Sequence, residues 1–183
     1  MKDFKLRMIV HTAMLAALTC VSTMVVRIPS PIGGYVNLGD CFVLLSGWIL
    51  GPIYGPVAAG TGSMMADLLS GYAHYAPGTL VIKAGMAVLA ALVCLFFQKR
   101  GLSSRLSWPA GGILAEIFMI LGYFAYSSII LGKGLVAASS IPGNLIQGLC
   151  GILSAYLVME LLARNRQVAG FMGITSPGRK NKP

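Results

Sequence analysis

The sequence predicts an all-α integral membrane protein with six transmembrane helices, and three observations predict this fold class. Of the 183 residues, 56% are hydrophobic and only 10% are charged, whereas soluble proteins average about 25% charged residues. The apolar residues form runs that approach the roughly 20 residues of a membrane span. The basic residues gather between and beyond these runs. Because about six spans use up a chain of this length, we expect a single six-helix transmembrane domain over 1–163.

The net charge of +9 follows a topological pattern. Basic residues precede the first apolar run, lie in the segment 99–105 and follow the last run, in a basic tail over 164–183 that we expect to be disordered. The positive-inside rule therefore places both termini and the 99–105 segment in the cytoplasm. We attribute the charge to orientation and lipid headgroups and not to nucleic acid. The four cysteines stand singly in apolar segments, so neither a disulfide framework nor a metal site is expected.

The first helix is predicted over about 8–26 and carries Ala13 and Ala17 four residues apart on one face. Small residues at this spacing let another helix approach closely, either within the chain or from a partner subunit. The segment 27–37 follows as an outer loop rich in proline and glycine. Glycine tolerates most backbone angles while proline fixes them, so this loop is either a lid or a plain connector.

The second and third helices are predicted over about 38–50 and 53–70, with a tight turn at Gly51. Asp40 falls in the first turn of the second helix, where the helix dipole favours a carboxylate. It is either a helix stabiliser or a site residue. Asp67 falls near the outer end of the third helix and is expected to point inward.

The last three helices are predicted over about 79–97, 109–131 and 141–162. Lys83 lies one turn inside the fourth helix, where it either extends outward to the interface or pairs with Asp40 or Asp67. Glu116 in the fifth helix lies nearer the inner half, so we interpret it as a tie between helices in preference to a ligand contact.

Ionisable and amide groups in apolar helices normally face a bundle interior or a cavity. Here they collect at the predicted outer ends of the helices, which indicates a pocket for one small polar molecule. The candidate substrate-binding residues are Tyr35, Asn37, Asp40, Asp67, His74, Tyr75, Lys83, Tyr123, Asn144 and Gln147. No phosphate loop, metal cluster or paired nucleophile and base accompanies them. Two other functions stay open: an ion-coupled carrier with Asp67 and Glu116 as proton sites, and a small intramembrane enzyme.

Several segments, taken in order, resemble the S components of energy-coupling factor (ECF) vitamin transporters. They are the Ala13-x-x-x-Ala17 face, the sequence Gly-Gly-Tyr-Val-Asn-Leu-Gly-Asp over 33–40, and Leu-Gly-Pro over 50–52 before a glycine-rich helix. The resemblance covers about 8–163. The Asn-Leu-Gly-Asp and Ala-Asp-Leu-Leu-Ser-Gly-Tyr segments, followed by Tyr-Ala-Pro and Ile-Lys, look most like the branch linked to pyridoxine or hydroxymethylpyrimidine.

This resemblance implies a high-affinity subunit of a prokaryotic plasma membrane that captures a vitamin from outside and has no enzymatic activity or cofactor of its own. A separate T component and two cytoplasmic ATPases would supply the energy, and Ala13 and Ala17 would dock the T component. The loop after the first helix would close over the ligand. The loop residues differ from those of the riboflavin, thiamin and biotin branches, so the ligand contacts of those branches do not transfer.

Overall fold

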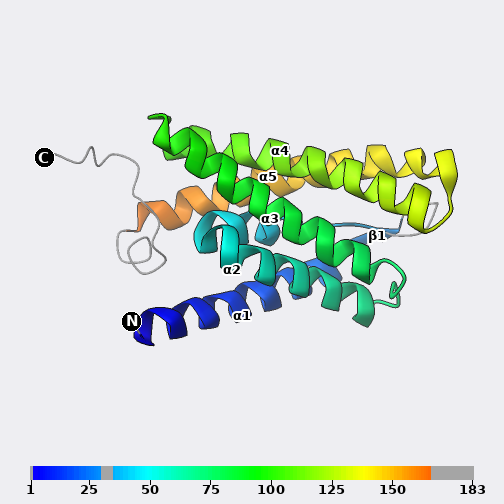
Figure 1. Cartoon of the computed structure of the whole chain (residues 1–183), viewed down its shortest axis with the longest axis horizontal. Helices are drawn as coiled ribbons and strands as arrows, with labels where there is room; N and C mark the ends of the chain where they lie inside the picture. Colours follow the sequence, from blue (N-terminus) through cyan, green and yellow to red (C-terminus); the bar gives the residue numbers. More distant parts are fainter. Residues whose placement is uncertain (1, 30–34, 166–183) are drawn as a thin grey trace, which may run out of the picture.

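The computed structural model describes residues 2–29 and 35–165, and in them the chain forms a bundle of long helices (Figure 1). Five helical stretches in this part are long and apolar enough to cross a membrane. The five helices are α1 (Lys2–Val25), α2 (Asp40–Leu69), α3 (Ala76–Lys99), α4 (Ser104–Ala125) and α5 (Ile141–Arg164). The predicted helical membrane architecture is confirmed. The predicted disorder of the tail concerns residues that lie almost entirely outside the described part.

Helix α2 folds back on itself at Gly51. This residue has φ 73° and ψ −171°, and a positive φ is strained for any residue with a side chain. In a straight helix, nine residues rise about 13 Å. Yet a Cβ built on Gly55 would lie only 2.6 Å from the carbonyl oxygen of Ser46. The arms 40–50 and 52–69 therefore pack against each other, as the predicted turn requires.

The predicted count of six spans is not confirmed. The first arm of α2, residues 40–50, rises only about 16 Å, about half of the 30 Å thickness of the hydrocarbon core. The sequence pattern predicted the two arms and the turn between them, but the first arm is too short to be a span of its own. Five helices, with α2 counted once, reach spanning length in the described residues.

The segment predicted as an irregular loop over 27–37 contains a short antiparallel pair of strands. These are β1 (Arg27–Pro29) and β2 (Tyr35–Asn37), with Arg27 opposite Asn37. The residues that join the strands, including Gly33 and Gly34, lie outside the described part. The pairing directs the chain from the end of α1 to the start of α2, and the role of this segment as a lid stays a prediction.

The helix predicted over 109–131 begins earlier, at Ser104, and ends close to the predicted residue, but its last turn is π-helical. Helix α4 passes into a π-helical turn, η1 (Tyr126–Ile130), and a 3₁₀ helix, η2 (Gly134–Ser140), leads into α5. π-Helical turns inside or beside α-helices are frequent at functional sites. The connection between α4 and α5 therefore consists mainly of one π-helical turn and one 3₁₀ helix.

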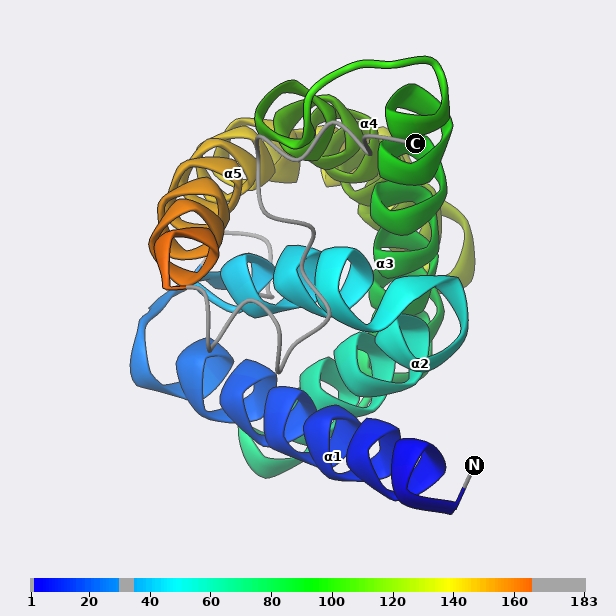
Figure 2. The same ribbon diagram turned by 90° about the vertical axis from the view of Figure 1, so that its left-hand side faces the viewer.

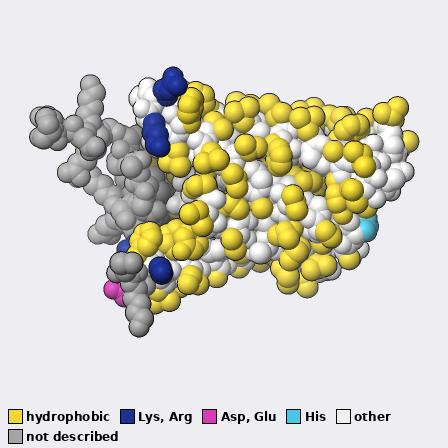
Figure 3. Space-filling model, in the orientation of Figure 1, with side chains coloured by type: hydrophobic (Ala, Val, Ile, Leu, Met, Phe, Trp, Pro, Cys, Tyr) yellow, Lys and Arg dark blue, Asp and Glu magenta, His cyan; other side chains and the backbone are white. Residues whose placement is uncertain are grey.

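Seen along the bundle, α1 lies on the outside of α2, while α2, α3, α4 and α5 surround a common core (Figure 2). Leu44, Leu45, Met86, Met119 and Met159 are fully buried in that core. Lysine and arginine side chains gather at one end of the molecule, and apolar side chains cover the flank between the ends (Figure 3). We call this the basic end; it contains the α3–α4 loop, the start of α1 and the end of α5 (Figure 1). The strands and the α2–α3 loop lie at the opposite end, which we call the hairpin end.

The fold-back of α2 gives a stability prediction. Gly55→Ala places a methyl group against the carbonyl of Ser46, and overpacking of this kind costs about 1–3 kcal/mol. Gly112→Ala is the matched control, because its Cβ would meet only side chains, at 3.3 Å or more. Thermal unfolding of the purified protein should show a lower midpoint for Gly55→Ala than for Gly112→Ala. Equal midpoints would contradict the close packing of the two arms.

Candidate functional site

Asp40 is the first residue of α2 and is completely buried. The chain enters the helix from β2 through Asn37, whose side-chain Oδ1 accepts a hydrogen bond from the backbone N–H of Gly39 at 2.8 Å. The helix dipole favours a carboxylate at this position, so the predicted stabilising role is compatible with the structure. Its carboxylate, however, also has partners from two other helices.

The Asp40 carboxylate forms a buried ion pair with Lys83 of α3, through Oδ1 and Nζ. Lys83 is only 2% exposed, so it does not extend outward to the interface. Of the two predicted partners, Asp40 is the one with which Lys83 forms the ion pair. Asp67 is also buried, near the end of α2. A buried pair of this kind persists only when further hydrogen bonds satisfy its remaining atoms.

Gln147 of α5 supplies those further hydrogen bonds. Its Nε2 donates to Asp40 Oδ2 at 2.7 Å, and its Oε1 accepts the backbone N–H of Asn37 at 2.9 Å. The side-chain Nδ2 of Asn37 also lies 3.4 Å from the same oxygen. One buried amide thereby connects strand β2 to the carboxylate at the start of α2.

Glu116 of α4 joins the same group and is 4% exposed. A Cβ on Gly151 would lie 2.8 Å from Asp40 Cβ and 3.0 Å from Glu116 Oε1. Both acidic side chains therefore lie next to Gly151 of α5. Neither carboxylate oxygen of Glu116 has a hydrogen-bond partner within the described residues. The interpretation of Glu116 as a tie between helices stays a prediction, but its place beside Asp40 was not predicted. The signal was Gly148 and Gly151, which leave room on α5 for the acid.

We call these five residues the buried polar cluster: Asn37, Asp40, Lys83, Glu116 and Gln147. Tyr123 extends it, because its ring centroid lies 5.5 Å from Lys83 Nζ, within reach of a cation–π contact. The Tyr123 hydroxyl is 3.1 Å from Thr79 Oγ1, to which it donates. An aromatic face thus lies next to the charged groups.

A second group of polar residues lies at the hairpin end and ties two connections together. The Tyr126 hydroxyl donates to the backbone oxygen of His74 at 2.8 Å, and Lys133 Nζ donates to the Tyr75 hydroxyl at 2.7 Å. The rings of His74 and Tyr75 are 4.7 Å apart. Neither of these contacts of Tyr126 and Lys133 was predicted. Their partners come from a different connection, so sequence spacing gave no indication of this contact.

Two of the predicted site residues remain to be described, Tyr35 and Asn144. The side chain of Tyr35 lies outside the described part, so its role stays a prediction. Asn144 is half-buried on α5, one turn before Gln147, and takes no part in the hydrogen bonds given above. Taken together, the buried polar cluster offers carboxylates, an ammonium group and an amide beside an aromatic ring, a set suited to binding a small polar heterocycle.

Comparisons with known proteins agree with this architecture. Residues 3–164 match the family model of the ECF-type riboflavin transporter, S component. The chain is 36% identical over 134 residues to an uncharacterised protein of Pyrococcus woesei, covering 73% of this chain and 86% of the relative. It is 25% identical over 147 residues to the thiamine precursor transporter HmpT of Lactococcus lactis subsp. cremoris (strain MG1363), covering 79% of each chain.

A solved structure of the S component of a bacterial ECF transporter has the same fold. The TM-score is 0.70 at 21% sequence identity, over 87% of this chain and 97% of the other. The family match covers the five long helices, except for the first residue of α1, and every member of the buried polar cluster. Such a protein is a multi-pass transport subunit and not an enzyme. The chain belongs to the family of S components of ECF transporters.

Proposed function

We propose that this S component captures a small vitamin or vitamin precursor, with hydroxymethylpyrimidine or a vitamin B6 vitamer favoured. The observation that carries the proposal is the buried polar cluster, in which polar side chains from β2 and four helices lie next to one another. A pyridine or pyrimidine vitamin presents a ring nitrogen, a hydroxymethyl group and a flat face. Carboxylate and amide groups match its edge, and the Tyr123 ring matches its face. The similarity to the thiamine precursor transporter HmpT supports the same class.

The ligand would enter from outside a prokaryotic plasma membrane. The positive-inside rule assigns the basic end to the cytoplasm. The hairpin end, with His74 in the α2–α3 loop, then faces the outside. The substrate contacts predicted from sequence stay part of this proposal, and Glu116 is added to them. A separate T component and two cytoplasmic ATPases would drive uptake. A second candidate ligand is riboflavin, because the matching family model describes riboflavin transporters.

Calorimetry of the purified chain with hydroxymethylpyrimidine, pyridoxine and riboflavin tests the ligand class. We expect binding of one of the first two. We also expect Gln147→Met to weaken this binding by at least about tenfold, or 1.4 kcal/mol, because the variant loses the hydrogen bonds to Asp40 and Asn37.

Ser154→Ala is the matched control on the same helix. Its hydroxyl donates to backbone carbonyls of its own helix, at 2.6 Å to Cys150 and 3.1 Å to Gly151, so the ligand affinity of Ser154→Ala should stay near that of the wild type. Unchanged affinity in Gln147→Met would remove the buried polar cluster from the ligand site. Tight binding of riboflavin alone would favour the second candidate.

The outer face of α1 supports the proposed docking of a T component. Ala13 and Ala17 are exposed, whereas His11, Leu15 and Thr19 on the opposite face are buried. The packing of α1 on α2 instead uses Ala16, whose carbonyl oxygen would lie 2.4 Å from a Cβ on Gly62. The two alanines are therefore available for another helix, and small residues allow its close approach.

Replacing Ala13 or Ala17 with phenylalanine should abolish vitamin uptake in cells that express the complete transporter. Ligand affinity of the purified variants should stay unchanged, because the substitutions lie on the outer face of α1. Ala125→Phe, at an exposed alanine of α4, is the control and should preserve uptake. Normal uptake in both α1 variants would exclude this face as the docking surface.

A further inference from the structure

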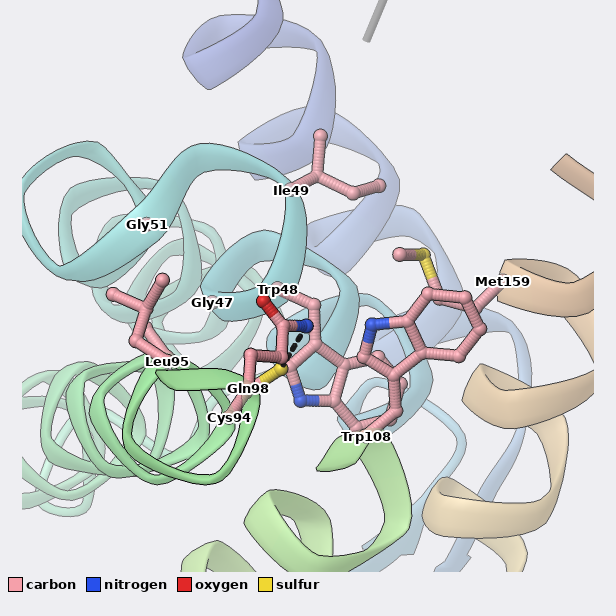
Figure 4. A pocket seen from close by; sticks show the side chains of 10 residues that line it. Gly47, Trp48, Ile49, Gly51, Cys94, Leu95, Gln98, Trp108 and Met159 are labelled. Atoms are coloured by element: carbon pink, nitrogen blue, oxygen red, sulfur yellow. Dashed lines mark hydrogen bonds between the residues drawn. The ribbon is translucent and has the colours of Figure 1, made fainter. Parts of the chain in front are cut away.

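A cavity of about 250 Å³ lies toward the basic end of the bundle, among α2, α3, α4 and α5 (Figure 4). Trp48 and Trp108 line it together with Met159, and Cys94 and Gln98 of α3 border it on another side. The two indole ring centroids are 6.5 Å apart, with their planes tilted by 30°. This cavity lies outside the proposed vitamin site.

Helix periodicity shows how far the two sites are separated. On α2, Asp40 and Trp48 are eight residues apart, and so are Glu116 and Trp108 on α4, a rise of about 12 Å in each helix. The completely buried Leu44 lies on the turn between them. Gly112 occupies the corresponding turn of α4, where an added Cβ would lie 3.4 Å from Trp48 and 3.6 Å from Leu44. An apolar layer therefore divides the cavity from the buried polar cluster.

The lining of the cavity selects against charged molecules. No lysine, arginine, aspartate or glutamate is among the described residues that line it. A charge placed there without a partner would lose its hydration with no compensation. The lining instead offers two broad aromatic faces and the polarizable sulfur of Met159, which interact favourably with another aromatic ring.

One polar atom in this lining lacks a partner. The indole Nε1 of Trp48 is buried and has no hydrogen-bond acceptor among the described residues. An indole nitrogen only donates, and a buried donor without an acceptor costs about 1–3 kcal/mol. Gln98 does not meet this need: its Nε2 is a donor and lies 3.2 Å from Cys94 Sγ, and its amide oxygen does not accept a hydrogen bond from Trp48. A ligand that carries an acceptor would satisfy the donor.

The size of the cavity limits the ligand to about one or two rings. An engineered apolar cavity of about 150 Å³ takes up benzene, and this one is larger, at about 250 Å³. We propose that the cavity is a second binding site, for an uncharged, flat heteroaromatic molecule whose hydrogen-bond acceptor faces the Trp48 indole N–H. The site is independent of the vitamin site at the buried polar cluster.

Tryptophan fluorescence reports on this cavity without a label, because Trp48 and Trp108 are the two tryptophans of the whole chain. The probes are quinoline, which has a ring-nitrogen acceptor, and naphthalene, which has the same shape without one. We expect both to quench the purified full chain saturably. In Trp48→Phe, the ratio of quinoline affinity to naphthalene affinity should fall about five- to tenfold, which is the loss expected for one hydrogen bond.

Trp108→Phe is the matched control, since it keeps the Trp48 donor and should preserve the wild-type ratio of quinoline to naphthalene affinity. Ala91→Leu fills the cavity from α3 and should abolish saturable quenching by both probes, with folding checked by thermal unfolding. Quenching that rises linearly with probe concentration in the wild type and in every variant would indicate that the probes only partition into the detergent micelle. That result would overturn the site. An unchanged affinity ratio in Trp48→Phe would overturn the assigned ligand class. Neither result depends on the vitamin.

Discussion

The buried ion pair between Asp40 and Lys83 is the interaction on which the candidate site depends. A charged side chain at the centre of a membrane helix costs about 2.5–3.5 kcal/mol on insertion scales. The cost is offset here because the two charges meet each other and Gln147 donates to the second carboxylate oxygen. The same amide accepts a hydrogen bond from Asn37. The pair thereby couples α2 and α3 to α5 and to the strand that enters α2.

Close helix packing is the second condition for this arrangement. A Cβ on Gly47 would lie 2.5 Å from the carbonyl oxygen of Ala87, and one on Gly111 would lie 2.7 Å from that of Ala90. Helices α2 and α4 therefore both approach the backbone of α3 closely, as is typical where small residues form the contact in membranes. Only with such short separations do the short carboxylate of Asp40 and the side chains of α4 and α5 reach one another.

Much of the fold could be predicted from the sequence, because apolar runs and breaks are local signals. The helices predicted over 79–97 and 141–162 correspond to α3 (Ala76–Lys99) and α5 (Ile141–Arg164), and the turn at Gly51 is present. The choice of Asp40 over Asp67 as the ion-pair partner of Lys83 could not be predicted. It depends on how the arms of α2 fold back against α3. The place of Glu116 depends similarly on the register of α4 against two glycines of α5.

The double variant Asp40→Asn, Lys83→Met tests most directly whether the ion pair serves the ligand and not the fold alone. Each single variant leaves one buried charge uncompensated and should lose about 3–5 kcal/mol of folding stability. The double variant keeps the shape of the cluster without either charge, so it should recover most of that stability. Calorimetry on the folded double variant should then show no binding of hydroxymethylpyrimidine or pyridoxine. Wild-type affinity for the bound vitamin in that variant would contradict the account, because the ion pair would then serve the fold alone.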